Sequence, residues 1–157
     1  VYAMNRGGVT LTGGEPLLQA AFAAEVLAAL QAAGVHTAVE TSGYAAPEVF
    51  RRVAGHADLV LFDVKHADPV QHRRWTGVDN APILRNLAWL CTSGRPFVVR
   101  IPLIPGVNDT RENMRYHKTA GAKYAMIGRT YAPGFDTGAE PRVHDVFSDY
   151  NLKTLIQ

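Results

Sequence analysis

Four short apolar segments alternate with segments of helical periodicity, and this alternation constrains the fold more than any other feature of the chain. The strand-like segments lie at residues 9–12, 35–40, 59–62 and 97–101. Glycines such as Gly34, Gly77 and Gly94 end the segments between them, as glycines commonly end helices. Strands that alternate with helices form a parallel sheet with right-handed crossovers. We therefore predict an α/β fold.

The helical segments are predicted at about residues 17–33, 47–55, 69–76 and 80–92, and another helix can start at Thr110. In the first of them Leu18, Phe22, Val26 and Leu30 recur at helical spacing. Residues from about 119 to 138 are rich in Gly, Ala, Thr and Pro and are predicted to be mostly loop. A last helix at 141–149 and a last strand at 152–156 complete the expected elements.

Composition excludes several classes of protein. A chain of 157 residues suits one domain, 1–157, and a net charge of +2 with scattered basic residues argues against nucleic acid or an anionic membrane as partner. No apolar run approaches the roughly 20 residues that cross a bilayer, and the first residues have no signal-peptide pattern. A single cysteine favours a reducing, cytoplasmic compartment. The start at Val1, just before a strand, is expected of a chain cut from a longer one.

Polar residues gather directly after the four predicted strands. They are Gly13, Gly14 and Glu15, then Glu40 and Ser42, then Asp63 and Lys65 around Val64, and finally Arg100. In α/β folds the carboxyl ends of parallel strands form the ligand site. We therefore expect these residues to line one site.

Each candidate has two interpretations. The turn that ends at Glu15 can receive a ligand ammonium group, or it is a plain strand–helix turn. Asp63 and Lys65 point to the same face of a strand, where they grip a polar ligand or form an exposed ion pair. Arg100, inside an apolar strand, needs a partner or a polar cavity. His117 is interpreted as an ordinary loop histidine.

The remaining histidines and the cysteine do not suggest a metal site. Cys91 lies beside Leu87 and Leu90 and is predicted to be a core residue. The other histidines lack metal-ligand spacing and are interpreted as surface or structural residues: His36, His56, His66, His72 and His144.

Five ordered stretches between residues 7 and 114 resemble the glycyl-radical enzyme activating enzymes, of which pyruvate formate-lyase activase is the best known. They are GGVTLTGGEPLLQ at 7–19, ETSGY at 40–44, DLVLFDVKH at 58–66, WTGVDN at 75–80 and RIPLIPGVND at 100–109. The resemblance implies a radical-SAM fold, a partial TIM-like barrel of parallel βα units, incomplete in this chain. It also implies an anaerobic oxidoreductase.

In that family a [4Fe-4S] cluster on a CxxxCxxC loop reduces S-adenosylmethionine (SAM), and the resulting 5′-deoxyadenosyl radical takes a hydrogen from a glycine of a partner enzyme. The resemblance implies a glycyl radical enzyme as protein substrate and a flavodoxin or ferredoxin as reductant. It places SAM at Gly13, Gly14 and Glu15, which hold the amino group, and at Asp63, Val64 and Lys65, with Lys65 suited to the carboxylate. Glu40, Ser42, Arg100 and His117 are expected near the same ligand.

Two departures from the family matter. The CxxxCxxC loop is absent, so we expect this chain to carry no cluster, no metal and no catalytic residue of its own. Tyr116-His117-Lys118 follows the ND stretch almost at once, which indicates an internal loss of about 20 residues, one βα unit, near 114–116.

A non-catalytic remnant that binds SAM weakly or not at all is the alternative function. A metal-dependent barrel hydrolase using Asp63, Lys65 and His117 is a third interpretation.

Overall fold

The computed structural model describes residues 7–102, 104, 106–119, 124–127 and 153–156. The chain forms two compact units. The first unit comprises Val1–Asp63 and Ala81–Val98, and the second comprises Val64–Asn80 and Val99–Gln157. The hydrogen bonds described below join residues of the same unit.

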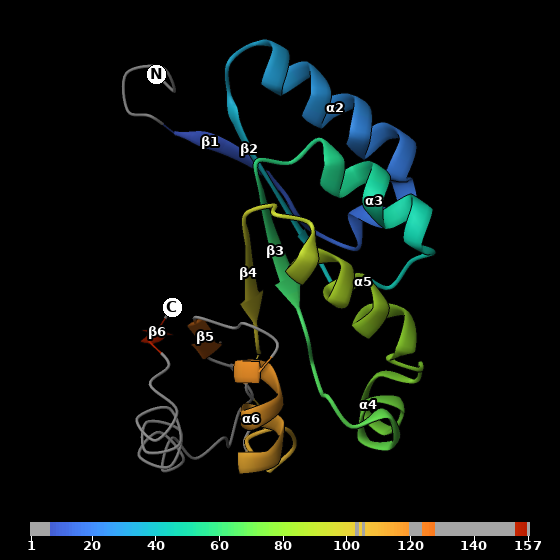
Figure 1. The fold of residues 1–157 in the computed structure, drawn as a ribbon, viewed down its shortest axis with the longest axis vertical. Helices are drawn as coiled ribbons and strands as arrows, with labels where there is room; N and C mark the ends of the chain where they lie inside the picture. Colours follow the sequence, from blue (N-terminus) through green and yellow to red (C-terminus); the bar gives the residue numbers. More distant parts are fainter. Residues whose placement is uncertain (1–6, 103, 105, 120–123, 128–152, 157) are drawn as a thin grey trace. The chain divides into compact units, whose positions relative to one another are not determined.

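A four-stranded sheet runs in the order β1-β2-β3-β4 (Figure 1). Its strands are β1 (Gly8–Leu11), β2 (His36–Thr41), β3 (Leu59–Asp63) and β4 (Phe97–Arg100). β1 pairs with β2, and β2 with β3, in parallel. Beside β3, the Val60 N–H donates to the Pro96 carbonyl at 3.1 Å. The predicted α/β fold with a parallel sheet is therefore confirmed, and the predicted strand ends are correct to within one residue.

Helices of the first unit lie on one side of these strands (Figure 1). They are the 3₁₀ helix η1 (Pro16–Gln19), α2 (Ala20–Ala32), α3 (Pro47–Gly55) and α5 (Ala81–Thr92). Phe50 of α3 forms the centre of the aromatic packing, with its ring edge-on to Phe62 of β3 at 5.6 Å and to Trp89 of α5 at 5.9 Å. Edge-on contacts at these distances are favourable beyond the area that they bury.

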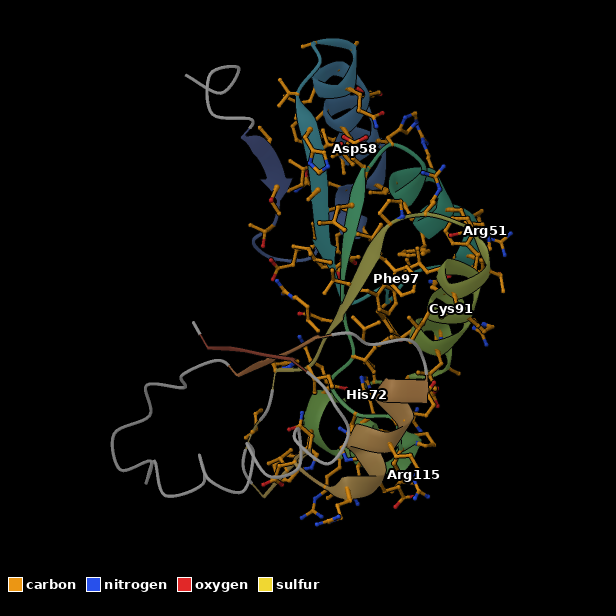
Figure 2. All side chains as sticks on the ribbon, turned by 60° about the vertical axis from the view of Figure 1, so that its left-hand side comes forward. Arg51, Asp58, His72, Cys91, Phe97 and Arg115 are labelled. Atoms are coloured by element: carbon orange, nitrogen blue, oxygen red, sulfur yellow. The ribbon has the colours of Figure 1, made fainter. Side chains whose placement is uncertain are left out.

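At the amino ends of β2 and β3, Asp58 holds the two strands together (Figure 2). Its carboxylate accepts from the Thr37 backbone N–H at 2.8 Å, from the Thr37 hydroxyl at 2.9 Å and from the Gln31 amide at 3.0 Å. The hydrogen bond from the Thr37 backbone is the main cause that lowers the pKa of Asp58. This cluster lies at the end of the sheet opposite the predicted ligand site.

In the second unit, local signals in the sequence define the helices. Asp68 caps α4 (Pro69–Thr76) by accepting from the Gln71 N–H at 2.7 Å, and Gly77 ends it in the left-handed conformation with φ +81°. The Thr110 hydroxyl accepts from the Asn113 N–H at 3.2 Å, which caps α6 (Arg111–Thr119). A separate parallel pair joins β5 (Tyr124–Ile127) to β6 (Lys153–Ile156).

Three expectations about the elements need correction or fall outside the described residues. The buried face of α2 consists of Ala23, Ala24 and Leu27, whereas Leu18 and Phe22 are 83% and 63% exposed. Val26 and Leu30, the other two residues of the predicted face, are half-buried. Residues 124–127 form a strand inside the stretch predicted as loop. The expected helix at 141–149 lies outside the described residues.

Within the part of the chain that the structure describes, no helix is long and apolar enough to cross a membrane.

Candidate functional site

The turn after β1 contains two exposed glycines, and both have a backbone conformation that only glycine adopts readily. Gly13 and Gly14 have φ angles of +81° and +46°. A Cβ atom added to either of them meets no atom of the described residues within 4 Å, apart from those of its own chain neighbours. The positive φ angles therefore disfavour other residues by strain, although the space at the Cβ positions would admit a side chain.

Glu15 closes this turn through its carboxylate, which accepts four hydrogen bonds from residues that the structure describes. Oε1 accepts from the Leu17 N–H at 3.2 Å and the Thr41 hydroxyl at 2.6 Å. Oε2 accepts from the Ser42 N–H at 3.0 Å and the Ser42 hydroxyl at 2.6 Å. A carboxylate has about four acceptor positions. Glu15 therefore ties the β1–η1 turn to the end of β2.

The loop after β2 is held from two further sides in the first unit. Asn86 of α5, which is 1% exposed, donates its amide to the Gly43 carbonyl at 2.8 Å and to the Ala45 carbonyl at 3.0 Å. Gly43 has φ +70°, and a Cβ atom there would overlap the Phe62 ring. The loop that carries Ser42 is therefore fixed by Glu15, Asn86 and close packing. Glu40, the last residue but one of β2 before this loop, is half-buried.

Asp63 and Lys65 are both half-buried, and Val64 between them is fully buried. This alternation is the period-2 pattern expected at the end of a strand. In the second unit, the Val64 N–H donates to the Arg100 carbonyl at 3.0 Å. Arg100, the last residue of β4, is itself half-buried.

His117 lies in α6, not in a loop, so the loop interpretation was wrong. The cap formed by Thr110 was the sequence signal that could have extended the helix this far. The His117 side chain lies outside the described part of the structure.

Cys91 is exposed on α5, so its prediction as a core residue was wrong (Figure 2). Leu87 and Leu90 occupy the buried face, at 2% and 0% exposure, and Cys91 lies one position beyond it. Partial desolvation still raises the pKa of the Cys91 thiol. Among the described residues, no group of three His, Cys, Asp or Glu could hold a metal ion.

Two histidines of the second unit are buried and structural, as the sequence suggested. His72 is 2% exposed, with Nδ1 at 2.9 Å from the Val78 carbonyl. His66 is 7% exposed, and its Nδ1 accepts from the Asp68 N–H at 3.0 Å. Burial is the main cause that lowers the pKa of His66, which favours the neutral ring that this hydrogen bond requires.

Sequence reasoning missed the role of buried asparagines. Their side chains bind the backbone of the loops that carry the candidate site residues, and all are at most 2% exposed: Asn80, Asn86, Asn108 and Asn113. The sequence did contain a signal for two of these residues, because Asn80 and Asn108 lie inside the stretches 75–80 and 100–109 that resemble the family. Only the fold shows which carbonyls they meet.

Comparison with known families decides the class of this arrangement. Residues 2–115 match the radical SAM superfamily. The chain belongs to that superfamily. This radical SAM chain is 40% identical over 152 residues to the choline trimethylamine-lyase activating enzyme of Oleidesulfovibrio alaskensis, covering 83% of the chain and 49% of that enzyme. It is 35% identical over 173 residues to the 4-hydroxyphenylacetate decarboxylase activating enzyme of Clostridioides difficile, covering 94% and 54%.

The radical SAM chain thus spans about half the length of the curated relatives it matches. Among solved structures, it is similar to a domain of the pyruvate-formate lyase-activating enzyme from Bacteroides vulgatus, with a TM-score of 0.80 and 29% identity. That match covers 96% of this chain and 99% of the other. A TYW1 structure with a TM-score of 0.74 and 16% identity, covering 92% and 50%, shows the shared fold alone.

Proposed function

We propose that this chain is the SAM-binding portion of a glycyl-radical enzyme activating enzyme. The observation that carries the proposal is the superfamily match over residues 2–115, which includes all four strand ends with their polar residues. The curated relatives described above are activating enzymes, among them those of a choline trimethylamine-lyase and a 4-hydroxyphenylacetate decarboxylase. Reductive cleavage of SAM supplies the hydrogen-abstracting species of such enzymes, and a glycyl radical enzyme is the proposed protein substrate.

The Gly13-Gly14 turn supports a SAM site, because glycines lack side chains and no described residue occupies their Cβ positions, so a ligand ammonium group can approach the backbone there. Glu15 keeps the turn in shape through its bonds to the chain, so the glycine backbone is the proposed ammonium contact. Lys65 is proposed to bind the SAM carboxylate, and Asp63 a hydroxyl or amine.

Hydrogen bonds within each unit hold some of the other residues that are proposed to lie near SAM. The loop with Ser42 and the neighbouring Glu40 lies beside the Glu15 carboxylate in the first unit. Val64 and Arg100 are joined through their backbones in the second. His117 is proposed on the family resemblance alone.

The residues of this chain do not fit a [4Fe-4S] cluster. The chain has one cysteine, Cys91, and a cluster of this family takes three thiolates. The proposal for this chain is therefore limited to binding and orienting SAM. A reductant of the flavodoxin or ferredoxin type is proposed only for an enzyme that contains the cluster.

An internal loss near 114–116 is part of the same proposal. The alignment with the C. difficile enzyme is 173 positions long, but it contains only 94% of the 157 residues of this chain, about 148 residues. About 25 positions of that enzyme therefore have no counterpart in this chain. An alignment of 113 residues with the (2S)-3-sulfopropanediol dehydratase activating enzyme of Klebsiella oxytoca covers 72% of the chain, also about 113. These lengths support a loss of about one βα unit.

The test is calorimetric titration of the chain with SAM, comparing Gly14→Ala with Gly34→Ala. Both glycines have positive φ angles, +46° and +72°, and open space around them. The two variants therefore carry similar backbone strain, about 1–2 kcal/mol each. Gly14 lies at the carboxyl end of the sheet and Gly34 at the amino end.

We expect Gly14→Ala to weaken SAM binding at least tenfold and Gly34→Ala to leave it within twofold. Equal weakening by both variants would show that only stability matters. A wild-type chain that binds no SAM would favour the non-catalytic remnant.

A further inference from the structure

Three asparagines of the second unit converge on one irregular segment, the loop of Lys65, His66 and Ala67 that follows β3. Asn108 comes from the segment after β4, Asn113 from α6, and Asn80 from the end of the connection after α4. Each is 2% exposed. Buried amides in this number are unusual unless they satisfy specific partners.

The amide of Asn108 uses both of its N–H donors and one acceptor position of its oxygen. Nδ2 donates to the Lys65 carbonyl at 2.7 Å and to the Pro102 carbonyl at 2.9 Å. Oδ1 accepts from the Ile104 N–H at 2.7 Å. One side chain therefore joins the Lys65 backbone to the segment that follows β4.

The other two asparagines complete the support of the loop. Asn113 accepts from the Ala67 N–H at 2.8 Å and donates to the Asn108 carbonyl at 2.9 Å. Asn80 donates to the Ala67 carbonyl at 2.8 Å and to the His66 carbonyl at 3.2 Å. Three consecutive loop carbonyls thus accept from asparagine amides, and Asn113 supports Asn108 in turn.

We propose that Asn108, supported by Asn113, is a positioning residue that fixes the Lys65 backbone so that its ammonium group meets the carboxylate of the ligand. This inference rests on the proposed SAM site. A lysine side chain has large rotamer freedom, and a moving backbone under it spreads the charge over a still larger volume. The hydrogen bonds of the asparagine network described above all join side-chain amides to backbone groups, so the network acts on the backbone of Lys65 and not on its ammonium group.

A structural role alone predicts a loss of stability and nothing more. Positioning predicts a loss that depends on the ligand's carboxylate. Two probes separate these cases, S-adenosylhomocysteine, which has the amino-acid carboxylate, and 5′-methylthioadenosine, which lacks it. Thr37→Val is the matched control, because it removes a buried hydroxyl that binds Asp58 at the amino end of the sheet.

The first measurement is amide hydrogen exchange of the full chain without ligand. We expect Asn108→Ala and Asn113→Ala to increase exchange at Ala67 at least tenfold. The Val64 amide, which donates to the Arg100 carbonyl, is the internal reference. Asn113→Ala is the milder variant because it leaves the Asn108 amide in place, so it serves if Asn108→Ala does not fold. Unchanged exchange at Ala67 in a folded variant would overturn the proposal.

The second measurement is the affinity for the two probes. We expect Asn108→Ala or Asn113→Ala to weaken S-adenosylhomocysteine binding about tenfold, a decade being about 1.4 kcal/mol, while 5′-methylthioadenosine changes less than twofold. Thr37→Val should change neither. In a Lys65→Met background the asparagine variants should have no further effect on either probe.

The outcomes are distinguishable. If the wild type binds both probes and the asparagine variants weaken the binding of both equally, the positioning role is overturned. The same holds if the variants weaken the binding of neither probe. In both cases the proposed SAM site still stands. Failure of the wild type to bind either probe overturns the proposed function, and the positioning role with it.

Discussion

Replacing Glu15 by glutamine tests the clamp between the β1–η1 turn and the end of β2. The change is nearly isosteric, but it exchanges one acceptor oxygen for an amide that donates. The Thr41 and Ser42 hydroxyls can rotate and accept from that amide. The two backbone N–H groups, of Leu17 and Ser42, cannot.

Either orientation of the new amide therefore leaves one backbone N–H without its acceptor. If nitrogen takes the place of Oε1, the Leu17 N–H loses its partner; if it takes the place of Oε2, the Ser42 N–H does. A group left unsatisfied in this way costs about 1–3 kcal/mol, and the loss of charge weakens the remaining bonds. We expect a destabilisation of about 2 kcal/mol for this half-buried turn.

The assay is thermal and urea unfolding of the chain without ligand. A loss of about 2 kcal/mol corresponds to a fall of about 4–8 °C in Tm for a chain of this size. Glu25→Gln is the control, because Glu25 is an exposed residue of α2 and undergoes the same chemical change. If Glu15→Gln unfolds at the same temperature as Glu25→Gln, the carboxylate is no clamp and its role must be sought in ligand binding.

Three further outcomes are expected. Gly43→Ala should lower the free energy of unfolding in urea by about 3 kcal/mol, because the φ of +70° strains the alanine and its Cβ overlaps the Phe62 ring. Gly94→Ala, with φ +71° and no described atom near its Cβ, should lower it by only about 1 kcal/mol, and equal losses would contradict the overlap. The hydrogen bonds that lower the pKa of Asp58 stabilise the fold above the unfolded value of 3.8, and this stabilisation is lost as pH falls through the lower folded value. In urea unfolding, Asp58→Asn should therefore lose about 1 kcal/mol of stability at pH 7, and the loss should shrink progressively as pH falls below 3.8; a loss that stays constant would contradict the shift. Cys91 is exposed but has a raised pKa, so its alkylation by iodoacetamide at pH 7.5 should be slower in the folded chain than in urea; a faster reaction when folded would contradict the shift.

The sequence by itself determined the α/β class and most of the helices and strands. The signals were local: apolar runs of strand length, Asp68 and Pro69 at the start of α4, Gly77 at its end, and Pro47 at the start of α3. Each acts within a few residues of itself, through a cap, a fixed φ angle or a side-chain period. The family resemblance then brought the polar residues of the strand ends into one hypothesis about SAM.

Tertiary structure alone decided what those residues contact. Glu15 and Ser42 are 27 residues apart, and Asn108 is 43 residues from Lys65, so no local pattern pairs them. The same holds for the burial of Ala23 and the exposure of Phe22 on α2, because apolar residues lie all around that helix and only packing against the sheet selects a face. Hydrogen bonds of buried polar groups depend on which chain segments are brought together, and that is settled by the packing of the whole unit.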